Sequence, residues 1–230
     1  MYLECRNLRF RYPGTPKLLF KDLSLKFDQP GFHSLFGPSG AGKSSLARLL
    51  SGLLIPDEGT IHFDAVDVSL YAHNLERLPG WSSIGDHLGR ITPEKNHDKM
   101  RSLIQDFDLT PHFEKRFSQL SLGQKNRINL VRYLVQDFQV LISDECLANV
   151  DEKMRARILA SIKSMFPELL FIYISHNVME VASFCKQIWV LRGPDRENQA
   201  TLVRGQDCCD EGAVDRHALQ QTMLEIVNAA

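Results

Sequence analysis

A glycine-rich loop constrains the fold of this chain more than any other feature of the sequence. The loop consists of Gly37, Pro38, Ser39, Gly40, Ala41, Gly42, Lys43 and Ser44. It fits the phosphate-binding pattern G-x-x-x-x-G-K, followed by Ser or Thr, at every fixed position. A short apolar run at residues 33–36 precedes the loop, and leucines at helical spacing follow it as far as Gly52. We therefore predict a strand, a tight loop and a helix in succession, and a chance match to a glycine-rich turn is the weaker interpretation.

The residue types in this loop explain how it would bind phosphate. Glycines let the backbone wrap closely around the anion, and the first N–H groups of the next helix point at it from the positive end of the helix dipole. Lys43 would reach the β- and γ-phosphates, and the Ser44 hydroxyl would be a ligand of Mg²⁺. The loop alone predicts nucleotide binding without saying which kind of nucleotide-driven protein this is.

The composition argues against two classes of function. The chain has 27 basic and 28 acidic residues and a net charge of −1, so we expect no nucleic-acid partner. No apolar run approaches the roughly 18–20 residues that a membrane-spanning helix needs. The five cysteines are an odd number without a zinc-binding spacing, and we expect them to be the reduced thiols of a cytosolic protein.

The rest of the chain alternates between strand-like and helix-like segments. Strands are predicted at residues 3–11, 18–27 (as a strand pair), 60–64, 67–71, 138–145, 169–176 and 187–191. Helices are predicted at residues 92–106, 125–135, 152–165, 178–184 and 214–228. Residues 75–90 have no clear pattern, and residues 193–212 are expected to be a linker or irregular turn. Buried strands that alternate with helices are typical of a parallel sheet of the α/β class.

Polar residues follow the apolar strands where a ligand would bind. One strand ends at Gly37, another at Asp144 and Glu145, and a third at Ser175 and His176. In open α/β sheets, ligands bind at the carboxyl ends of the strands. An aspartate at such an end suits Mg²⁺, and a second carboxylate beside it suits the base that takes a proton from an attacking water.

Together these motifs resemble those of the ATP-binding cassette (ABC) ATPases, over roughly residues 2–192. Residues 37–44 resemble the Walker A loop, Leu120-Ser121-Leu122-Gly123-Gln124 resembles the LSGGQ signature, residues 140–145 resemble Walker B, and residues 148–151 resemble the D-loop. The resemblance implies an α/β fold of the P-loop NTPase class and ABC type. That fold has a mixed core sheet with flanking helices, an antiparallel β part at the N-terminus and a short helical subdomain at about residues 75–118. We expect residues 1–204 to form the ATPase domain and residues 205–230 to form a C-terminal extension with a terminal helix.

The resemblance also implies ATP and Mg²⁺ as cofactors and assigns a role to each motif. Glu145 would polarise the attacking water and His176 would sense the γ-phosphate, while Ser44 and Asp144 would hold Mg²⁺. Tyr12 would stack on adenine. The implied ATP-binding residues are Tyr12, Gly37, Pro38, Ser39, Gly40, Ala41, Gly42, Lys43, Ser44, Ser45, Ser121, Gly123 and Gln124.

A single chain would supply only half of each ATP site. The resemblance implies a head-to-tail homodimer, or a heterodimer with a similar chain, in which ATP lies between Walker A of one subunit and the signature of the other. It implies an ATPase that powers a transporter through separate integral membrane subunits, which would dock on the helical subdomain. The expected location is cytoplasmic, peripheral on the inner face of the cell membrane.

Several positions depart from the family pattern. Leu122 replaces a glycine of the signature, Cys146 replaces the proline after the catalytic glutamate, and Ala148 replaces a serine of the D-loop. The glutamine of the Q-loop has no counterpart, and either Asn74 or His73 stands at its position. These departures keep an alternative open, in which the chain is a non-transport or weakly hydrolysing ABC protein that acts as a regulatory ATP switch.

Overall fold

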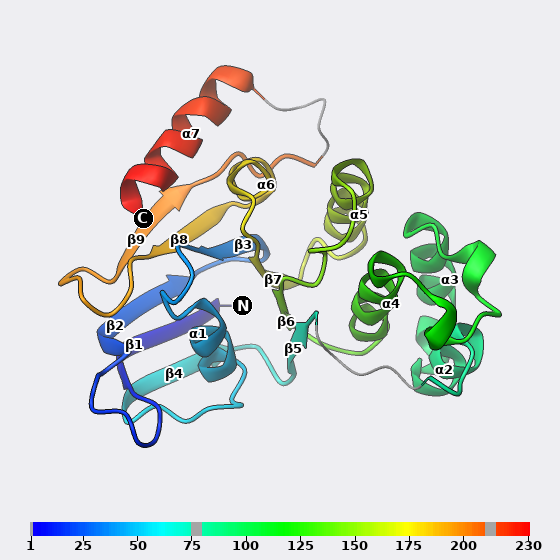
Figure 1. Cartoon of the computed structure of the whole chain (residues 1–230), viewed down its shortest axis with the longest axis horizontal. Coiled ribbons are helices and arrows are strands. Elements are labelled where there is room, and N and C mark those ends of the chain that lie inside the picture. Colours follow the sequence, from blue (N-terminus) through cyan, green and yellow to red (C-terminus); the bar gives the residue numbers. More distant parts are fainter. Residues whose placement is uncertain (1, 75–79, 210–214) are drawn as a thin grey trace.

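The computed structural model describes residues 2–74, 80–209 and 215–230, which form two sheets with helices around them (Figure 1). The smaller sheet has the strand order β2-β1-β4 and is antiparallel. Its strands are β1 (Tyr2–Phe10), β2 (Phe20–Phe27) and β4 (Glu58–Asp64). The strand predicted at residues 3–11 is confirmed, but the pair predicted at residues 18–27 is wrong, because that segment forms β2 alone. The antiparallel N-terminal part is therefore as expected.

Strand β1 buries side chains of one face along its whole length despite a break in its alternation. Leu3 and Cys5 are buried, and so are Leu8 and Phe10, three and five residues further on. The pairing of β1 with β2 shifts between Cys5 and Leu8, where Asn7 has a φ of 51°. This bulge absorbs one residue and returns the later side chains to the same face of the sheet.

The larger sheet has the order β5-β6-β7-β3-β8-β9 among the described residues. Its strands are β3 (Gly31–Phe36), β5 (Ser69–His73), β6 (Val140–Asp144), β7 (Leu170–Ile174), β8 (Gln187–Leu191) and β9 (Ala200–Arg204). The neighbours from β5 to β8 are parallel, and β9 is antiparallel to β8. The predicted linker at residues 193–212 is therefore wrong over β9. That edge strand buries Val203 alone, which leaves little pattern to detect.

The larger sheet is the middle layer of the fold. Val140 and Ile142 of β6 face α1 (Lys43–Leu50) and the buried side of the smaller sheet, whereas Leu141 between them faces the opposite layer of helices. Both faces are therefore apolar, which explains the nearly continuous hydrophobic runs of β6 and β7. Figure 1 shows α1 in the space between the two sheets.

The remaining described helices are α2 (Ile84–Ile91), α3 (His97–Asp106), α4 (Leu122–Leu134), α5 (Glu152–Met165), α6 (Val178–Phe184) and α7 (Arg216–Ala229). Except for α3, each begins at a residue whose side chain accepts a hydrogen bond from the first turn. The capping residues are Ser83, Ser121, Asp151, Asn177 and Asp215. Helix α4 begins earlier than predicted because Ser121 and Gln124 form a capping box.

Helices α2 and α3 lie beside α4, away from the smaller sheet (Figure 1). They fall within the helical subdomain expected at about residues 75–118, of which residues 75–79 lie outside the described residues. The proposed division into domains stays a prediction. No helix in the described part of the chain is long and apolar enough to cross a bilayer.

The terminal helix α7 packs on α6 and β9, and Ile226 is fully buried in the contact. The segment that leads to it is fastened by Lys163 of α5. The Lys163 ammonium donates to the Phe184 carbonyl at 3.0 Å, the Asp207 carboxylate at 2.6 Å and the Cys208 carbonyl at 2.7 Å. The structure thus has the α/β fold with mixed core sheet and terminal helix that the sequence predicts.

Candidate functional site

The glycine-rich loop leaves the end of β3 in a conformation that requires its first glycine. Gly37 has a φ of 137°, and a Cβ atom there would lie 2.2 Å from the Leu191 carbonyl oxygen. The loop backbone therefore passes directly against the end of β8, and any side chain would displace it. Gly40 and Gly42 also have positive φ, at 81° and 98°. The loop reaches the N-terminus of α1 with its backbone curled around Lys43.

Lys43 lies at the centre of this loop. Its ammonium donates to the Gly37 carbonyl at 2.7 Å and to the Pro38 carbonyl at 3.0 Å. Burial lowers the pKa of Lys43, while the negative charges of Glu145 and Asp144 oppose that shift. The loop therefore holds a cation at the first residue of α1, and a helix N-terminus with a cation beside it is the chemistry that a phosphate group needs.

A cavity of about 380 Å³ opens over the loop. It is lined by Tyr12, Leu19, Ser39, Gly40, Gly42, Lys43, Ser44, Ser45, Glu145 and His176. The structure thus gathers most of the predicted loop residues around one space, together with Glu145, His176 and Tyr12. The carbonyls of Gly37 and Pro38 contact the Lys43 ammonium, and Ala41 is buried. The cavity has Lys43 and the first residues of α1 in its lining, which fits the phosphate end of a nucleotide.

Tyr12 lies at the rim of this cavity. Its hydroxyl is 2.9 Å from the Ser45 hydroxyl, and its ring contacts the Phe10 ring edge-on with 5.1 Å between centroids. The ring stays 38% exposed. This arrangement suits a base-stacking role, which remains a prediction.

Asp144 and Glu145 lie at the carboxyl end of β6, but they face different partners. The Asp144 carboxylate accepts a hydrogen bond of 2.8 Å from the Tyr71 hydroxyl. Glu145 has a φ of 54°, which turns its side chain toward His176. The Glu145 carboxylate lies 2.6 Å from Nε2 of His176. The predicted base and the predicted γ-phosphate sensor are therefore in direct contact.

The oxygen donors near the loop fit a magnesium ion. The Ser44 hydroxyl lines the cavity, and the Asp144 carboxylate is near enough to the Lys43 ammonium to influence its pKa. Mg²⁺ prefers hard oxygen ligands and is usually held by one or two protein groups together with substrate phosphates. Ser44 and Asp144 would supply the protein's share.

Sequence reasoning missed Tyr71. This residue lies on β5, and burial raises its pKa, with a further contribution from Asp144, so the phenol keeps its proton and donates it. Tyr71 pairs with Ile142 in the sheet, which brings its side chain to the Walker B aspartate. Strand register is not visible in a single sequence, so nothing pointed to this contact in advance.

The signature residues lie away from the cavity, at the N-terminus of α4. Ser121 accepts a hydrogen bond from the Gln124 backbone, and the Gln124 side chain accepts one from the Ser121 backbone at 2.9 Å. Gln124 also lies 2.8 Å from Nε2 of His112. A Cβ atom at Gly123 would lie 2.5 Å from the Asn149 carbonyl. Within one chain, the signature therefore contacts the D-loop and presents Leu122, which is 64% exposed.

The structure leaves both candidates for the Q-loop position open. His73 is the last residue of β5 and pairs with Asp144, and its carbonyl accepts a hydrogen bond of 2.8 Å from Asn129. Asn74 follows directly, and the next residues lie outside the described part of the chain.

The chain is similar to a known family and to proteins of several organisms. The family model described as ABC transporter matches residues 20–148, which is more than half of the chain. An uncharacterized ABC transporter ATP-binding protein of Haemophilus influenzae is 30% identical, over 86% of this chain and 85% of that protein. The spermidine/putrescine import ATP-binding protein PotA of Fusobacterium nucleatum is 29% identical, over 75% of this chain and 50% of that protein. The chain thus spans about half the length of the first curated relatives that it matches.

Two solved structures share the fold. A bacterial Atm1-family ABC exporter with ATP bound superposes with a TM-score of 0.79 at 20% identity, covering 99% of this chain and 41% of that chain. A dimeric ATP-binding cassette in a post-hydrolysis state, bound to ADP and Pi, superposes with a TM-score of 0.68 at 18% identity, covering 83% and 94%.

Proposed function

Because the chain belongs to the ABC transporter family, we propose that it binds and hydrolyses ATP as the ATPase subunit of a transporter. The observation that carries the proposal is the convergence of Lys43, Ser44, Glu145 and His176 on one cavity at the ends of β3, β6 and β7. A phosphate loop and a base in contact with a histidine form an arrangement that hydrolyses a phosphoanhydride bond.

The protein's own groups would divide the work as follows. Lys43 and the first N–H groups of α1 bind and orient the phosphates, and the Ser44 and Asp144 oxygens hold the metal ion. Mg²⁺, when bound, would neutralise phosphate charge. The Glu145 carboxylate accepts the proton of the attacking water, and His176, 2.6 Å away, is placed to orient that carboxylate.

The second half of the site would come from another subunit. The signature residues Ser121 and Gly123 lie at the start of α4 and do not line the cavity in their own chain. Helix N-termini bind anions, and that of α4 presents an exposed residue, Leu122, to the surroundings. A head-to-tail dimer would bring this helix end to the γ-phosphate of its partner, as a homodimer or with a similar chain.

The proposed transport partner is an integral membrane protein that docks beside α2. Trp81, two residues before the Ser83 cap of α2, is 81% exposed. Exposed tryptophans are frequent anchors of protein interfaces. Some relatives carry names of import ATP-binding proteins, for spermidine/putrescine and for taurine. We infer a peripheral location on the cytoplasmic face of the membrane, with the substrate and direction of transport set by the partner.

Two observations favour a second candidate function, a regulatory ATP switch with weak hydrolysis. Leu122 places a bulky apolar side chain where the dimer would close, and neither Asn74 nor His73 supplies the longer amide of glutamine. Both changes would affect closure of the dimer and coupling of ATP hydrolysis to a partner, and both leave the phosphate loop intact.

Two substitutions at the cavity test the proposed ATPase. Lys43→Ala should abolish ATP binding or turnover, because the phosphates lose the buried cation, whereas Lys153→Ala on the exposed side of α5 should behave as wild type. Glu145→Gln should slow turnover by about 10²–10⁴-fold, the usual contribution of a positioned base, and leave ATP bound. Glu168→Gln is its matched control. Undiminished turnover in Lys43→Ala would refute the assignment.

The assembly is tested separately. Glu145→Gln with ATP and Mg²⁺ should elute from a sizing column as a dimer, and persistent monomer would contradict the shared site. The wild-type chain should copurify with an integral membrane protein after mild detergent extraction. Trp81→Ala should weaken that association, while Leu53→Ala, an exposed leucine after α1, should not. Recovery without any membrane partner would favour the regulatory switch.

A further inference from the structure

The buried carboxylate of Glu180 lies outside the lining of the ATP cavity and has several polar partners. Glu180 on α6 is 5% exposed. Its Oε2 accepts hydrogen bonds from the Tyr173 hydroxyl at 3.0 Å and the Ser175 hydroxyl at 3.1 Å. Its Oε1 accepts one from the Asn177 side chain at 3.2 Å and lies 2.5 Å from Nε of Arg155. Burying a charge is costly, and these partners offset the cost.

These contacts enclose the segment that carries His176. Ser175 and Asn177 are its neighbours in sequence, and both donate to Glu180. The Asn177 backbone also donates to the Ser175 hydroxyl at 3.1 Å, which closes a small ring of hydrogen bonds. The Glu180 carboxylate therefore fixes the backbone on both sides of His176. The imidazole of His176 itself contacts Glu145, with its Nε2 2.6 Å from the Glu145 carboxylate.

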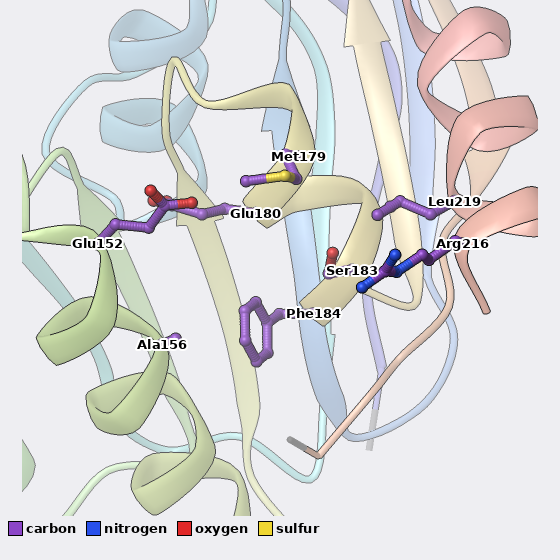
Figure 2. A pocket seen from close by; sticks show the side chains of 8 residues that line it. All are labelled: Glu152, Ala156, Met179, Glu180, Ser183, Phe184, Arg216 and Leu219. Carbon is purple, nitrogen blue, oxygen red and sulfur yellow. The ribbon is translucent and has the colours of Figure 1, made fainter. Parts of the chain in front are cut away.

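The same carboxylate reaches across to the helix that follows the D-loop. Arg155 belongs to α5, which begins at its cap Asp151, the last residue of the D-loop. Figure 2 shows the Glu180 side chain extending from α6 toward α5, at a groove of about 290 Å³ between α5, α6 and α7. The ion pair thus joins the D-loop helix to the His176 segment.

Stability alone is a weak reason for such a pair. Replacing a buried ion pair with apolar residues is often neutral or stabilising, whereas removing one partner leaves a costly buried charge. The pair does constrain geometry, because a carboxylate with four fixed partners tolerates little movement of any of them.

We propose that Glu180 is a positioning residue for His176, holding the histidine segment in place against α5 so that the imidazole meets Glu145. This inference rests on the proposed ATPase function. It predicts that loss of the Glu180 charge slows the hydrolytic step and leaves ATP binding unchanged, because the phosphate loop does not touch this network.

The test compares Glu180→Gln with Glu152→Gln, a change of an exposed glutamate that lines the same groove. We expect kcat to fall by about 10–100-fold in Glu180→Gln, the size of effect that a displacement of about 1 Å can produce, with the Kd for ATP within about twofold of wild type. Glu152→Gln should match wild type in both. An equal loss of ATP affinity and kcat, or a lower melting temperature with unchanged kcat of the folded protein, would overturn the positioning role.

Hydrogen exchange provides a readout that does not depend on turnover. In Glu180→Gln, the amides of residues 170–184 should exchange faster, while those of residues 37–52 should not change. If wild type shows no turnover, the proposed function fails, and unchanged exchange at residues 170–184 then refutes the positioning role independently. If Glu180→Gln does not fold, Ser175→Ala removes one donor of the same network. It should reduce kcat several-fold with ATP affinity retained, and a wild-type kcat would contradict the proposal.

Discussion

Substituting Gly123 by alanine sets two physical effects against each other. Within a helix, alanine is favoured over glycine by about 0.5–1 kcal/mol, because glycine loses more backbone entropy on folding. Gly123 lies in the first turn of α4 with an ordinary helical backbone, so conformational strain plays no part. The added Cβ, however, would lie 2.5 Å from the Asn149 carbonyl oxygen. Backbone atoms cannot rotate away, so α4 or the D-loop must shift.

The size of the effect follows from that contact. Inserting a methyl group into a packed site costs typically about 1–3 kcal/mol, and subtracting the helical gain of about 0.5–1 kcal/mol leaves a net loss of about 0–2.5 kcal/mol. For a chain of this length, each kcal/mol shifts the melting temperature by about 2–4 °C. We therefore expect Gly123→Ala to melt below wild type by up to about 10 °C.

The matched control is Gly89→Ala. Gly89 lies in α2, and a Cβ atom there would have no neighbour within 4 Å. The helical gain then acts alone, and this variant should be more stable than wild type by up to about 1 kcal/mol. Both variants are followed by thermal and urea unfolding.

The D-loop links this packing to the proposed chemistry. The Ala148 N–H, in the same turn as Asn149, donates to the Glu145 carbonyl at 3.1 Å. Displacing Asn149 should therefore disturb Glu145, and ATP turnover should fall in Gly123→Ala beyond the loss of folded protein. If Gly123→Ala is as stable as Gly89→Ala, the reasoning from the contact is refuted.

Three further perturbations are specific enough to test. Burial lowers the pKa of His33 from its ordinary 6.5 to about 4. Between these pH values the unfolded chain binds a proton that the folded chain does not. The free energy of unfolding should therefore fall by about 3 kcal/mol as the pH drops through this range. His33→Gln should flatten that slope in urea titrations, and an unchanged slope would assign the acid sensitivity elsewhere. Tyr71→Phe removes the donor to Asp144 and should raise the Mg²⁺ concentration needed for tight ATP binding by about tenfold, as measured by calorimetry. ATP affinity without Mg²⁺ should stay unchanged and is the internal control. An unaltered Mg²⁺ requirement would contradict the role of the hydrogen bond. Leu122→Gly restores the family residue at the proposed interface and should raise ATP-dependent dimerisation and turnover several-fold, whereas reduced turnover would show that Leu122 assists closure.

Local signals predicted several elements to the residue. Helix α5 and helix α6 have the bounds predicted for residues 152–165 and 178–184, because Asp151 and Asn177 cap them. Strand β8 likewise matches residues 187–191. Strand β9 was missed because its partner β8 stabilises it, and pairing is a property of the folded chain. Helix α2 lay in a stretch without a clear pattern, although Ser83 caps it.

For the candidate site too, some residues could be predicted from the sequence and others could not. The loop at residues 37–44 could be predicted because its glycines, lysine and serine are contiguous and each has a chemical reason. Tyr71 and Glu180 could not, since their contacts depend on strand register and on the ion pair that Glu180 of α6 forms with Arg155 of α5.

The contacts of the Lys163 ammonium determine where the chain can be cleaved without unfolding the remainder. A proteolytic nick or a truncated expression clone that ends after β9 would remove Asp207 and Cys208 and leave Phe184 as the remaining partner of the charge. The Asp207 side chain is 36% exposed, so solvent screens this ion pair. Losing hydrogen bonds to a charged group costs about 1.5–3 kcal/mol, a sizeable fraction of the roughly 5–15 kcal/mol that holds a typical domain folded. Cleavage beyond residue 209 would spare all three contacts. Limited digestion should therefore release α7 without unfolding the remainder only when the cut falls on the C-terminal side of that residue.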